Sequence, residues 1–155
     1  SRMSSTEYIT LYIGGQLFGA AVSRIHDVFA PESITPVPLA TKEVAGLLNL
    51  RGRIVTAIDA RSRLGLPKRE DDASVMAIGI EKGTESFGLL IDEVGEVKTL
   101  DDGDREDVPS NLDPVWAQIA SGVYRLDDGL LVVIDIDKIL AFESETDADR
   151  GAKAA

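Results

Sequence analysis

The sequence contains no cysteine, a single histidine and few aromatic residues, and these absences exclude several kinds of site. Without cysteine there is no disulfide framework, thiolate nucleophile or cysteine-based zinc site. The only histidine, His26, leaves no multi-histidine metal set, and a catalytic triad would depend on it alone. Aromatic residues make up 5% of the chain and hydrophobic residues 44%. The predicted core therefore consists of valine, isoleucine, leucine and alanine.

Basic stretches and long apolar runs are missing as well. The net charge is −11, and no basic stripe is present to displace counterions from phosphates, which disfavours nucleic acid and an anionic membrane surface as partners. No apolar run approaches the length of about 20 residues that spans a bilayer, and the start lacks the pattern of a signal peptide. We expect a cytoplasmic protein, whose acidity indicates either solubility or a basic partner.

The sequence does contain an internal repeat. The pattern of residues 18–28, Phe-Gly-x-x-Val-x-x-Ile-x-Asp-Val, returns 69 positions later at residues 87–97 as Phe-Gly-x-x-Ile-x-x-Val-x-Glu-Val. A second set repeats at an offset of 76 and matches Gly46, Leu50, Ile58, Asp59 and Leu64 with Gly122, Leu126, Ile134, Asp135 and Leu140. A period near 70 is too long for a solenoid unit and too short for two self-sufficient domains. We expect two similar lobes packed as one body, with a cleft or shared face between them that binds a partner.

Short apolar segments separated by glycine and aspartate turns predict an all-β fold of two small barrels. The expected strands cover residues 8–13, 17–22, 53–59, 75–81, 86–91, 94–100, 123–126 and 130–134. Asp59 and Asp135 are placed to cap short helices at residues 60–64 and 136–142. Residues 66–72 form a polar break, and residues 101–114 an acidic loop.

This pattern predicts a single domain over residues 8–140. Its first lobe covers approximately residues 8–66 and its second approximately residues 73–140, and the terminal segments could exchange between the lobes. We expect flexible tails at residues 1–7 and 143–155, because the last residues are small and charged.

One segment is similar to a known family. Residues 46–55, Gly-Leu-Leu-Asn-Leu-Arg-Gly-Arg-Ile-Val, followed by Ile58-Asp59 and Arg61, resemble the signature of the CheW family of bacterial chemotaxis coupling proteins. The segments 18–28 and 87–94 also resemble that family, in the same order, so the resemblance covers roughly residues 8–140. Asp27 stands where many members have glutamate.

The resemblance implies both a fold and a function. The implied fold is a pair of five-stranded SH3-like β-barrels related by a pseudo-twofold axis, with short helices. The implied function is a non-enzymatic scaffold, without cofactor, that couples the cytoplasmic tips of chemoreceptors (methyl-accepting proteins) to the regulatory domain of the histidine kinase CheA. Its implied place is the cytoplasm, in receptor arrays at the inner face of the membrane. A similar adaptor for a receptor array that does not control motility stays open.

The expected receptor site combines aliphatic anchors with polar groups, namely Ile25, Asp27, Val28, Leu47 and Arg51. Two aliphatic side chains can accept an apolar helix face while a carboxylate pairs with a basic or polar group. For Ile25 and Val28 a place in the core is equally open. Arg51-Gly52 also suits a plain turn, with Arg51 pointing to solvent or to a local carboxylate such as Asp59. The resemblance favours partner binding.

The expected kinase site is an apolar patch on the segment 46–50 or on its counterpart in the second copy. Its candidate residues are Gly46, Leu48, Asn49, Leu50, Gly122, Val123 and Tyr124. Glycine-containing segments of this kind let a partner backbone approach closely.

A hydrolase or metal-dependent enzyme is the alternative from another class, and it would use the acidic residues between Asp92 and Asp107. The acidic loop lacks EF-hand spacing. Asp92 and Glu93 are adjacent on a predicted strand and therefore point to opposite faces. The sequence thus favours the scaffold.

Overall fold

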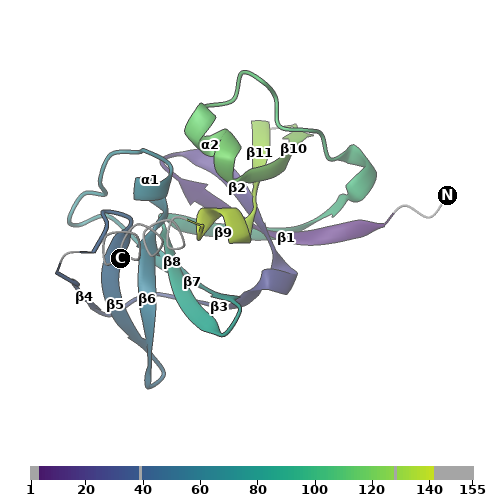
Figure 1. Cartoon of the computed structure of the whole chain (residues 1–155). Coiled ribbons are helices and arrows are strands. Elements are labelled where there is room, and N and C mark those ends of the chain that lie inside the picture. The colour runs from purple at the N-terminus through teal and green to yellow at the C-terminus, as the bar shows by residue number, and fades with distance from the viewer. Residues whose placement is uncertain (1–3, 39, 128, 142–155) are drawn as a thin grey trace, which may run out of the picture.

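Two β-sheets make up most of the chain in the computed structural model, which describes residues 4–38, 40–127 and 129–141 (Figure 1). The β1 sheet has the strand order β10-β11-β2-β1-β9, with β1 (Ser5–Ile13), β2 (Gln16–Ala21), β9 (Glu93–Asp101), β10 (Ala120–Leu126) and β11 (Gly129–Ile134). The β3 sheet has the order β3-β7-β8-β6-β5-β4, with β3 (Ile25–Phe29), β4 (Ile34–Thr35), β5 (Val44–Leu50), β6 (Arg53–Asp59), β7 (Met76–Lys82) and β8 (Glu85–Ile91).

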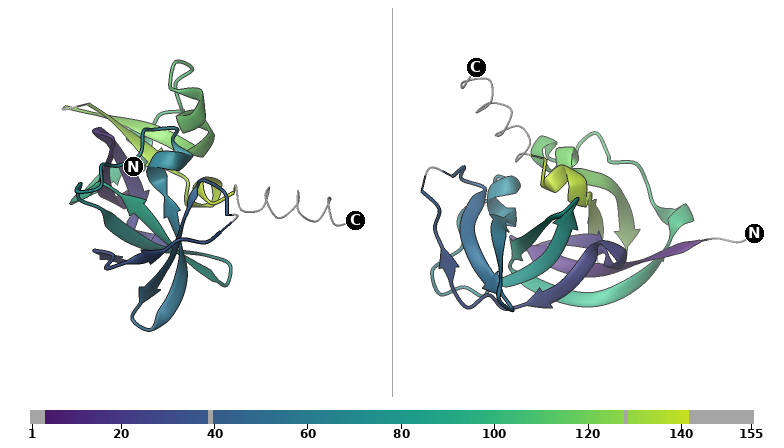
Figure 2. Two further views of the ribbon diagram at one scale, coloured as in Figure 1. Left: turned by 90° about the vertical axis from the view of Figure 1, so that its left-hand side faces the viewer. Right: turned by 60° about the horizontal axis from the view of Figure 1, so that its bottom comes forward.

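Each sheet draws strands from both halves of the chain. The β1–β2 hairpin of the first repeat copy pairs with β9 and β11 of the second, whereas the β7–β8 hairpin of the second copy pairs with β3 and β6 of the first. The sheets therefore do not coincide with two contiguous segments of sequence. Both are curled, and they lie against each other (Figure 2).

The registers of the two sheets are equivalent. Val132 lies opposite Phe18 in the parallel pair β11–β2, and the repeat-related residues Thr56 and Phe87 lie opposite each other in β6–β8. The expected all-β fold of two SH3-like barrels related by a pseudo-twofold is confirmed. The β3 sheet has in addition a sixth strand, the two-residue β4.

The main core lies between the two sheets. Its largest cluster of buried side chains combines Leu11 and Phe18 of the β1 sheet with Ile58, Ile78 and Leu89 of the β3 sheet. Each sheet also encloses a smaller cluster, around Leu48, Val55 and Leu90 in one case and around Tyr8, Tyr124 and Leu131 in the other. Because the largest buried surface is shared, the two lobes stabilise each other.

Short helices follow the last strand of each repeat copy. The Asp59 carboxylate caps α1 (Ala60–Arg63) by accepting from the Arg61 N–H, and Asp135 caps α3 (Ile136–Ile139) by accepting from the Lys138 N–H. Both caps were predicted from the sequence. Helix α2 (Pro114–Ile119) was not predicted, although Asp113 followed by proline at the first helical position is a helix start signal. Two 3₁₀ turns, η1 (Val22–Arg24) and η2 (Asp102–Asp104), complete the elements.

The predicted N-terminal tail is too long. Strand β1 begins at Ser5, and Ser5, Thr6 and Glu7 pair with β9, so these residues belong to the sheet. Ser4 and Thr6 also donate to the Asp102 carboxylate, which fixes the start of β1. The predicted tail at residues 143–155 lies outside the described residues. Within the described part of the chain, no helix is long and apolar enough to cross a membrane.

Candidate partner-binding site

An ion pair lies at one end of the barrel formed by the β3 sheet. Arg51 Nη1 is 3.4 Å from Asp27 Oδ2, so the tip of the β5–β6 hairpin contacts β3. A shallow pocket opens here, and its walls include Leu50, Val55 and Gly79 beside the two charged residues. His26 lies on the same rim, with Nε2 3.2 Å from Glu81 Oε1. The structure thus brings together two of the predicted receptor residues, and the local partner of Arg51 is Asp27 instead of Asp59.

The two charges differ in exposure. The Arg51 side chain is 77% exposed, whereas that of Asp27 is 18% exposed. The Oδ1 atom of Asp27 is buried and has no hydrogen-bond partner among the described residues. A carboxylate oxygen in this position is costly for the folded state. The pair therefore presents a guanidinium to solvent and holds its carboxylate in the wall of the pocket.

The backbone of Arg51 is strained. Arg51 has φ 52° and Gly52 has φ 85°, and Arg51 is the only residue other than glycine with a positive φ in the described part of the chain. The Asn49 carboxamide fixes the turn, because its Oδ1 accepts from the Gly52 N–H at 2.8 Å. Two successive positive φ angles are typical of a two-residue hairpin turn that favours asparagine or glycine first. An arginine here costs stability, and such outliers often mark functional positions.

The three aliphatic receptor candidates do not share one open face. Ile25 and Val28 are half-buried on β3 and pack against the main core. Leu47 is 37% exposed on β5, which β7, β8 and β6 separate from β3 in the sheet order. Ile25 and Val28 are therefore partly structural.

Most of the side chains predicted to bind the kinase are buried. Leu48, Val123 and Tyr124 are 3%, 0% and 2% exposed, and they belong to the core clusters. Leu50 packs against a core cluster as well, whereas Asn49 is exposed. These buried side chains cannot form the exposed apolar patch that was predicted to bind the kinase.

Gly46 and Gly122 make close approaches within the chain itself. A Cβ at Gly46 would overlap the Thr35 carbonyl oxygen of β4. A Cβ at Gly122 would lie 2.9 Å from the Arg105 side chain and 3.0 Å from the Glu106 carbonyl oxygen. Each glycine thus lets a preceding segment of the chain pack onto its own sheet. The prediction that these glycines allow a partner's backbone to approach closely did not take this role into account.

The exposed apolar residues of this segment lie on the other face of the β5–β6 hairpin. Leu47 and Ile54 are 37% and 64% exposed. Leu47 pairs with Thr56 across the hairpin, and Ile54 pairs with Asn49. Ile54 stands inside the motif of residues 46–55, but nothing in the sequence distinguishes its exposure from that of its buried neighbour Val55.

The equivalent face of the β1 sheet is covered. The repeat counterparts of Leu47 and Thr56 are Val123 and Val132, both 0% exposed. Helix α2 and the segment before it pack into the same cluster through Val108, Leu112, Trp116 and Ile119. Figure 1 shows α2 beside β2, β10 and β11, with β4, β5 and β6 at the opposite side of the molecule. The segment joining β3 to β5 has no helix among its described residues, so the face around Ile54 lacks such a cover.

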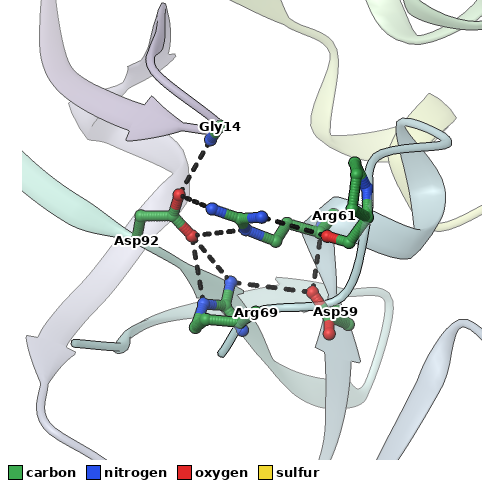
Figure 3. Close-up of polar contacts among 6 residues, drawn as sticks. Gly14, Asp59, Arg61, Arg69 and Asp92 are labelled. Carbon is green, nitrogen blue, oxygen red and sulfur yellow. Dashed lines mark hydrogen bonds and ion pairs between the residues drawn. The ribbon is translucent and has the colours of Figure 1, made fainter. Parts of the chain in front are cut away.

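A second polar cluster joins the two repeat copies (Figure 3). Asp92, between β8 and β9, accepts from Arg61 of α1 at 2.7 and 3.0 Å, from Arg69 at 3.0 Å and from the Gly14 N–H at 2.8 Å. Burial raises the pKa of the Asp92 carboxyl, but these hydrogen bonds outweigh it and lower the pKa to about 2. The cluster holds the β1–β2 turn, α1 and the segment after it against β8.

This cluster bears on the enzyme alternative. Asp92, the first residue of the acidic run, has its oxygens occupied by two guanidinium groups and a backbone N–H. Asp102 accepts from Ser4 and Thr6. Among the described residues no group of three or more histidine or acidic side chains is arranged to hold a metal ion. Asp92 and Asp102 thus serve local structure.

Comparison with known proteins gives the family. The model for the CheW-like domain matches residues 7–144. This chain belongs to the CheW-like family. The resemblance noted in residues 46–55 is therefore confirmed.

Several relatives cover most of this chain. It is 26% identical over 137 residues to the chemotaxis protein CheW of Rhizobium meliloti, with 88% of each chain covered. It is 28% identical over 134 residues to the chemotaxis protein CheW of Thermotoga maritima, covering 86% of this chain and 87% of that one. The crystal structure of the scaffolding protein TtCheW from Thermoanaerobacter tengcongensis matches with a TM-score of 0.76 and 27% identity, covering 84% of this chain and 89% of that chain. As a CheW-like protein, this chain is a chemotaxis coupling adaptor.

Proposed function

We propose that this protein is a non-enzymatic scaffold that couples chemoreceptor cytoplasmic tips to the regulatory domain of the kinase CheA, in arrays at the inner face of the membrane. The observation that carries the proposal is the CheW-like match over residues 7–144, because this range includes both sheets. A scaffold needs two partner surfaces, and the β3 sheet offers two different ones: the charged pair at the end of its barrel and the uncovered apolar face of its β5–β6 hairpin.

The receptor surface is proposed around Asp27 and Arg51. The guanidinium can hold carboxylates or carbonyls of a receptor helix in a bidentate manner. Ile25 and Val28 lie on β3 beside Asp27 and pack against the main core, so they hold in place the strand that carries the carboxylate. Leu47, which lies on another strand, is assigned to the second surface.

Charge reversal tests the receptor surface. Asp27→Lys should weaken binding of a receptor signalling fragment by about 1–3 kcal/mol, as expected for a hydrogen-bonded charge at an interface. The matched control is Glu96→Lys, because Glu96 is the repeat counterpart of Asp27 and is 74% exposed. Thermal melts should show both variants folded. Equal binding by both variants would place the receptor elsewhere.

The kinase surface is proposed on the outer face of the β5–β6 hairpin, formed by Leu47, Asn49, Ile54 and Thr56. The repeat-related face of the β1 sheet is covered by α2 and the segment before it. The face of the β5–β6 hairpin is exposed instead, so it is suited to bind an apolar surface of a partner protein. Membership of the CheW-like family also implies that the CheA regulatory domain shares this fold, and pairing of similar faces is then the natural geometry. Gly46, Leu48 and Leu50 support this face from beneath, and Gly122 and Tyr124, the counterparts of Gly46 and Leu48, do the same in the β1 sheet. Val123, the counterpart of Leu47, lies on the covered face of the β1 sheet.

An aspartate in the middle of this face tests the assignment. Ile54→Asp should reduce binding of the CheA regulatory domain by on the order of 2 kcal/mol, since truncating an interface anchor has effects of this size. Val97→Asp is the control, because Val97 is a β9 residue with 53% exposure. Salt should change the affinity little, as the contact is mostly apolar. Full affinity in the Ile54 variant would rule this face out.

A further inference from the structure

The position opposite Asp27 on the neighbouring strand is Gly79 of β7. A Cβ built on Gly79 would overlap Asp27 Oδ1, so the carboxylate occupies the space that any other residue would fill with its side chain. The backbone of Gly79 has no positive φ, unlike that of seven other glycines. Backbone conformation therefore does not explain the glycine, whereas the place of the Asp27 carboxylate does.

The repeat supplies an internal comparison. The counterpart of Gly79 in the β1 sheet is Thr10, whose hydroxyl donates to the Glu96 carbonyl oxygen at 2.6 Å. Glu96 itself, the counterpart of Asp27, is 74% exposed and pairs with Lys98 at 3.3 Å. Where a side chain fills this position, the acidic group thus points outward, whereas at Gly79 the carboxylate is 18% exposed and turned onto the hairpin tip.

We propose that Gly79 is a positioning residue for the receptor site, an inference that rests on the function proposed above. The missing side chain lets Asp27 turn inward, so that Oδ2 meets Arg51 and fixes the guanidinium at the end of the barrel. Asp27 then acts mainly by orienting Arg51, and the exposed guanidinium is the group that meets a hydrogen-bond acceptor of the receptor helix. The same difference between Gly79 and Thr10 assigns the site to the β3 sheet and not to its repeat-related sheet.

A side chain at position 79 should disturb the ion pair without disturbing the fold. Because the atom in the way is the far end of a side chain, Asp27 can rotate outward at low cost when a methyl group is added at position 79. The fold should survive, while the Asp27–Arg51 pair should not. A guanidinium that has lost its fixed orientation binds more weakly, since the partner must then order it.

The test compares two glycine substitutions in the full chain. Gly79→Ala should weaken binding of a receptor signalling fragment by about tenfold, which corresponds to the loss of about 1.4 kcal/mol. Gly88→Ala is the matched control, because Gly88 pairs with Gly79 on β8 and a Cβ there would meet nothing nearer than Leu48 at 3.5 Å. The control should change affinity less than twofold. In an Asp27→Ala background, Gly79→Ala should have no further effect, because the group it displaces is gone.

A receptor-independent measurement completes the test. A crystal structure of the free Gly79→Ala variant should show Asp27 turned away from Arg51; a carboxylate still on Arg51 overturns the proposal. If Gly79→Ala does not fold, Asp27→Ala/Gly79→Ala should fold, and failure of the double variant also overturns it. Asp27 could have moved in the Gly79→Ala variant while receptor affinity stays unchanged. If Asp27→Lys weakens binding in that case, the positioning role of Gly79 is refuted. If Asp27→Lys also binds normally, the proposed receptor site itself is refuted.

Discussion

At the scale of single residues, the proposed receptor site lies where the structure tolerates an unfavourable conformation. Arg51 adopts a left-handed backbone and Asp27 holds a buried oxygen without a partner among the described residues. Both features cost stability, and both lie in one ion pair. We infer that partner binding, and not folding, retains these residues.

Replacing the strained arginine should separate stability from binding. Arg51→Asn creates an Asn-Gly hairpin turn, and it should raise the free energy of unfolding by about 0.5–1 kcal/mol by relieving the left-handed backbone. Receptor binding should fall, because the guanidinium is lost. Urea denaturation measures the first effect and titration calorimetry the second. Arg53→Asn, on the adjoining strand, is the control and should not stabilise; a stabilised Arg51 variant with full affinity would show that the arginine has no binding role.

The sequence could identify the residues of the pair but not the exposure of their neighbours. Residues 46–55 carry the family motif, and Asp27 belongs to the repeat. Alternation along β5 and β6 separates two faces, but it does not say which is covered. Leu48 lies inside the β3 barrel and is buried, whereas Ile54 is exposed because α2, which covers the repeat-related face, has no counterpart among the described residues of the first copy. Gly79 carries no signal by itself, because its role depends on a side chain across the strand pair.

At the scale of elements, short segments fasten the sheets to each other. Helix α2 does so through Trp116, whose ring lies 5.4 Å from that of Phe18 and whose indole N–H donates to the Leu64 carbonyl at 3.0 Å. The Asp92 cluster joins the sheets through ion pairs of Asp92 with Arg61 and Arg69. The caps of α1 and α3 were predictable from aspartate spacing, whereas the Asp92 cluster joins residues far apart in sequence and was not.

Removing the indole should loosen α2. Trp116→Ala is expected to lower the free energy of unfolding by about 3 kcal/mol, since it deletes a packed aromatic ring and leaves a cavity. Val115→Ala, at a neighbouring position with 39% exposure, should change it by less than about 0.5 kcal/mol. Chemical denaturation of both variants gives the comparison. Similar losses in the two would mean that α2 does not cover the core.

Acid should release the Asp92 cluster. The carboxyl has a folded pKa of about 2 and an unfolded pKa of about 3.9. Its contribution to stability, roughly 2 kcal/mol, is therefore present above about pH 4 and is lost as the pH falls from 4 to 2. Urea denaturation at each pH gives the free energy of unfolding that is lost between pH 4 and pH 2. In Asp92→Asn this loss should be smaller by the contribution of Asp92, whereas the exposed control Asp72→Asn should lose as much as the unmodified protein. An unchanged acid profile in the Asp92 variant would contradict the assignment.

At the scale of the whole molecule, the two repeat copies interlock. Each sheet contains a hairpin from one copy and three or more strands from the other. The repeat predicted two similar lobes, but similarity alone does not reveal which hairpin completes which sheet. A hairpin that pairs with strands of its own copy and one that pairs with strands of the other copy require the same alternation of apolar and polar residues. Only the contacts in the folded structure distinguish these two arrangements.

Interlocking makes the two halves interdependent. A chain divided between residues 71 and 72 should give two fragments that are unfolded alone, because neither contains all the strands of a sheet. Mixed in equal amounts, the fragments should recover the circular dichroism of the intact protein. The intact chain should unfold in one cooperative transition. An independently folded fragment, or two separate transitions, would contradict the shared core.

The central claim is that one small protein bridges two partners through different surfaces of its β3 sheet. Its most direct test is capture of the CheA regulatory domain on an immobilised receptor signalling fragment, with and without this chain. The account predicts capture only when the chain is present, loss of both proteins from the receptor with Asp27→Lys, and retention of the chain without the kinase domain with Ile54→Asp. Kinase capture that is independent of the chain, or equal with all three forms, would contradict it.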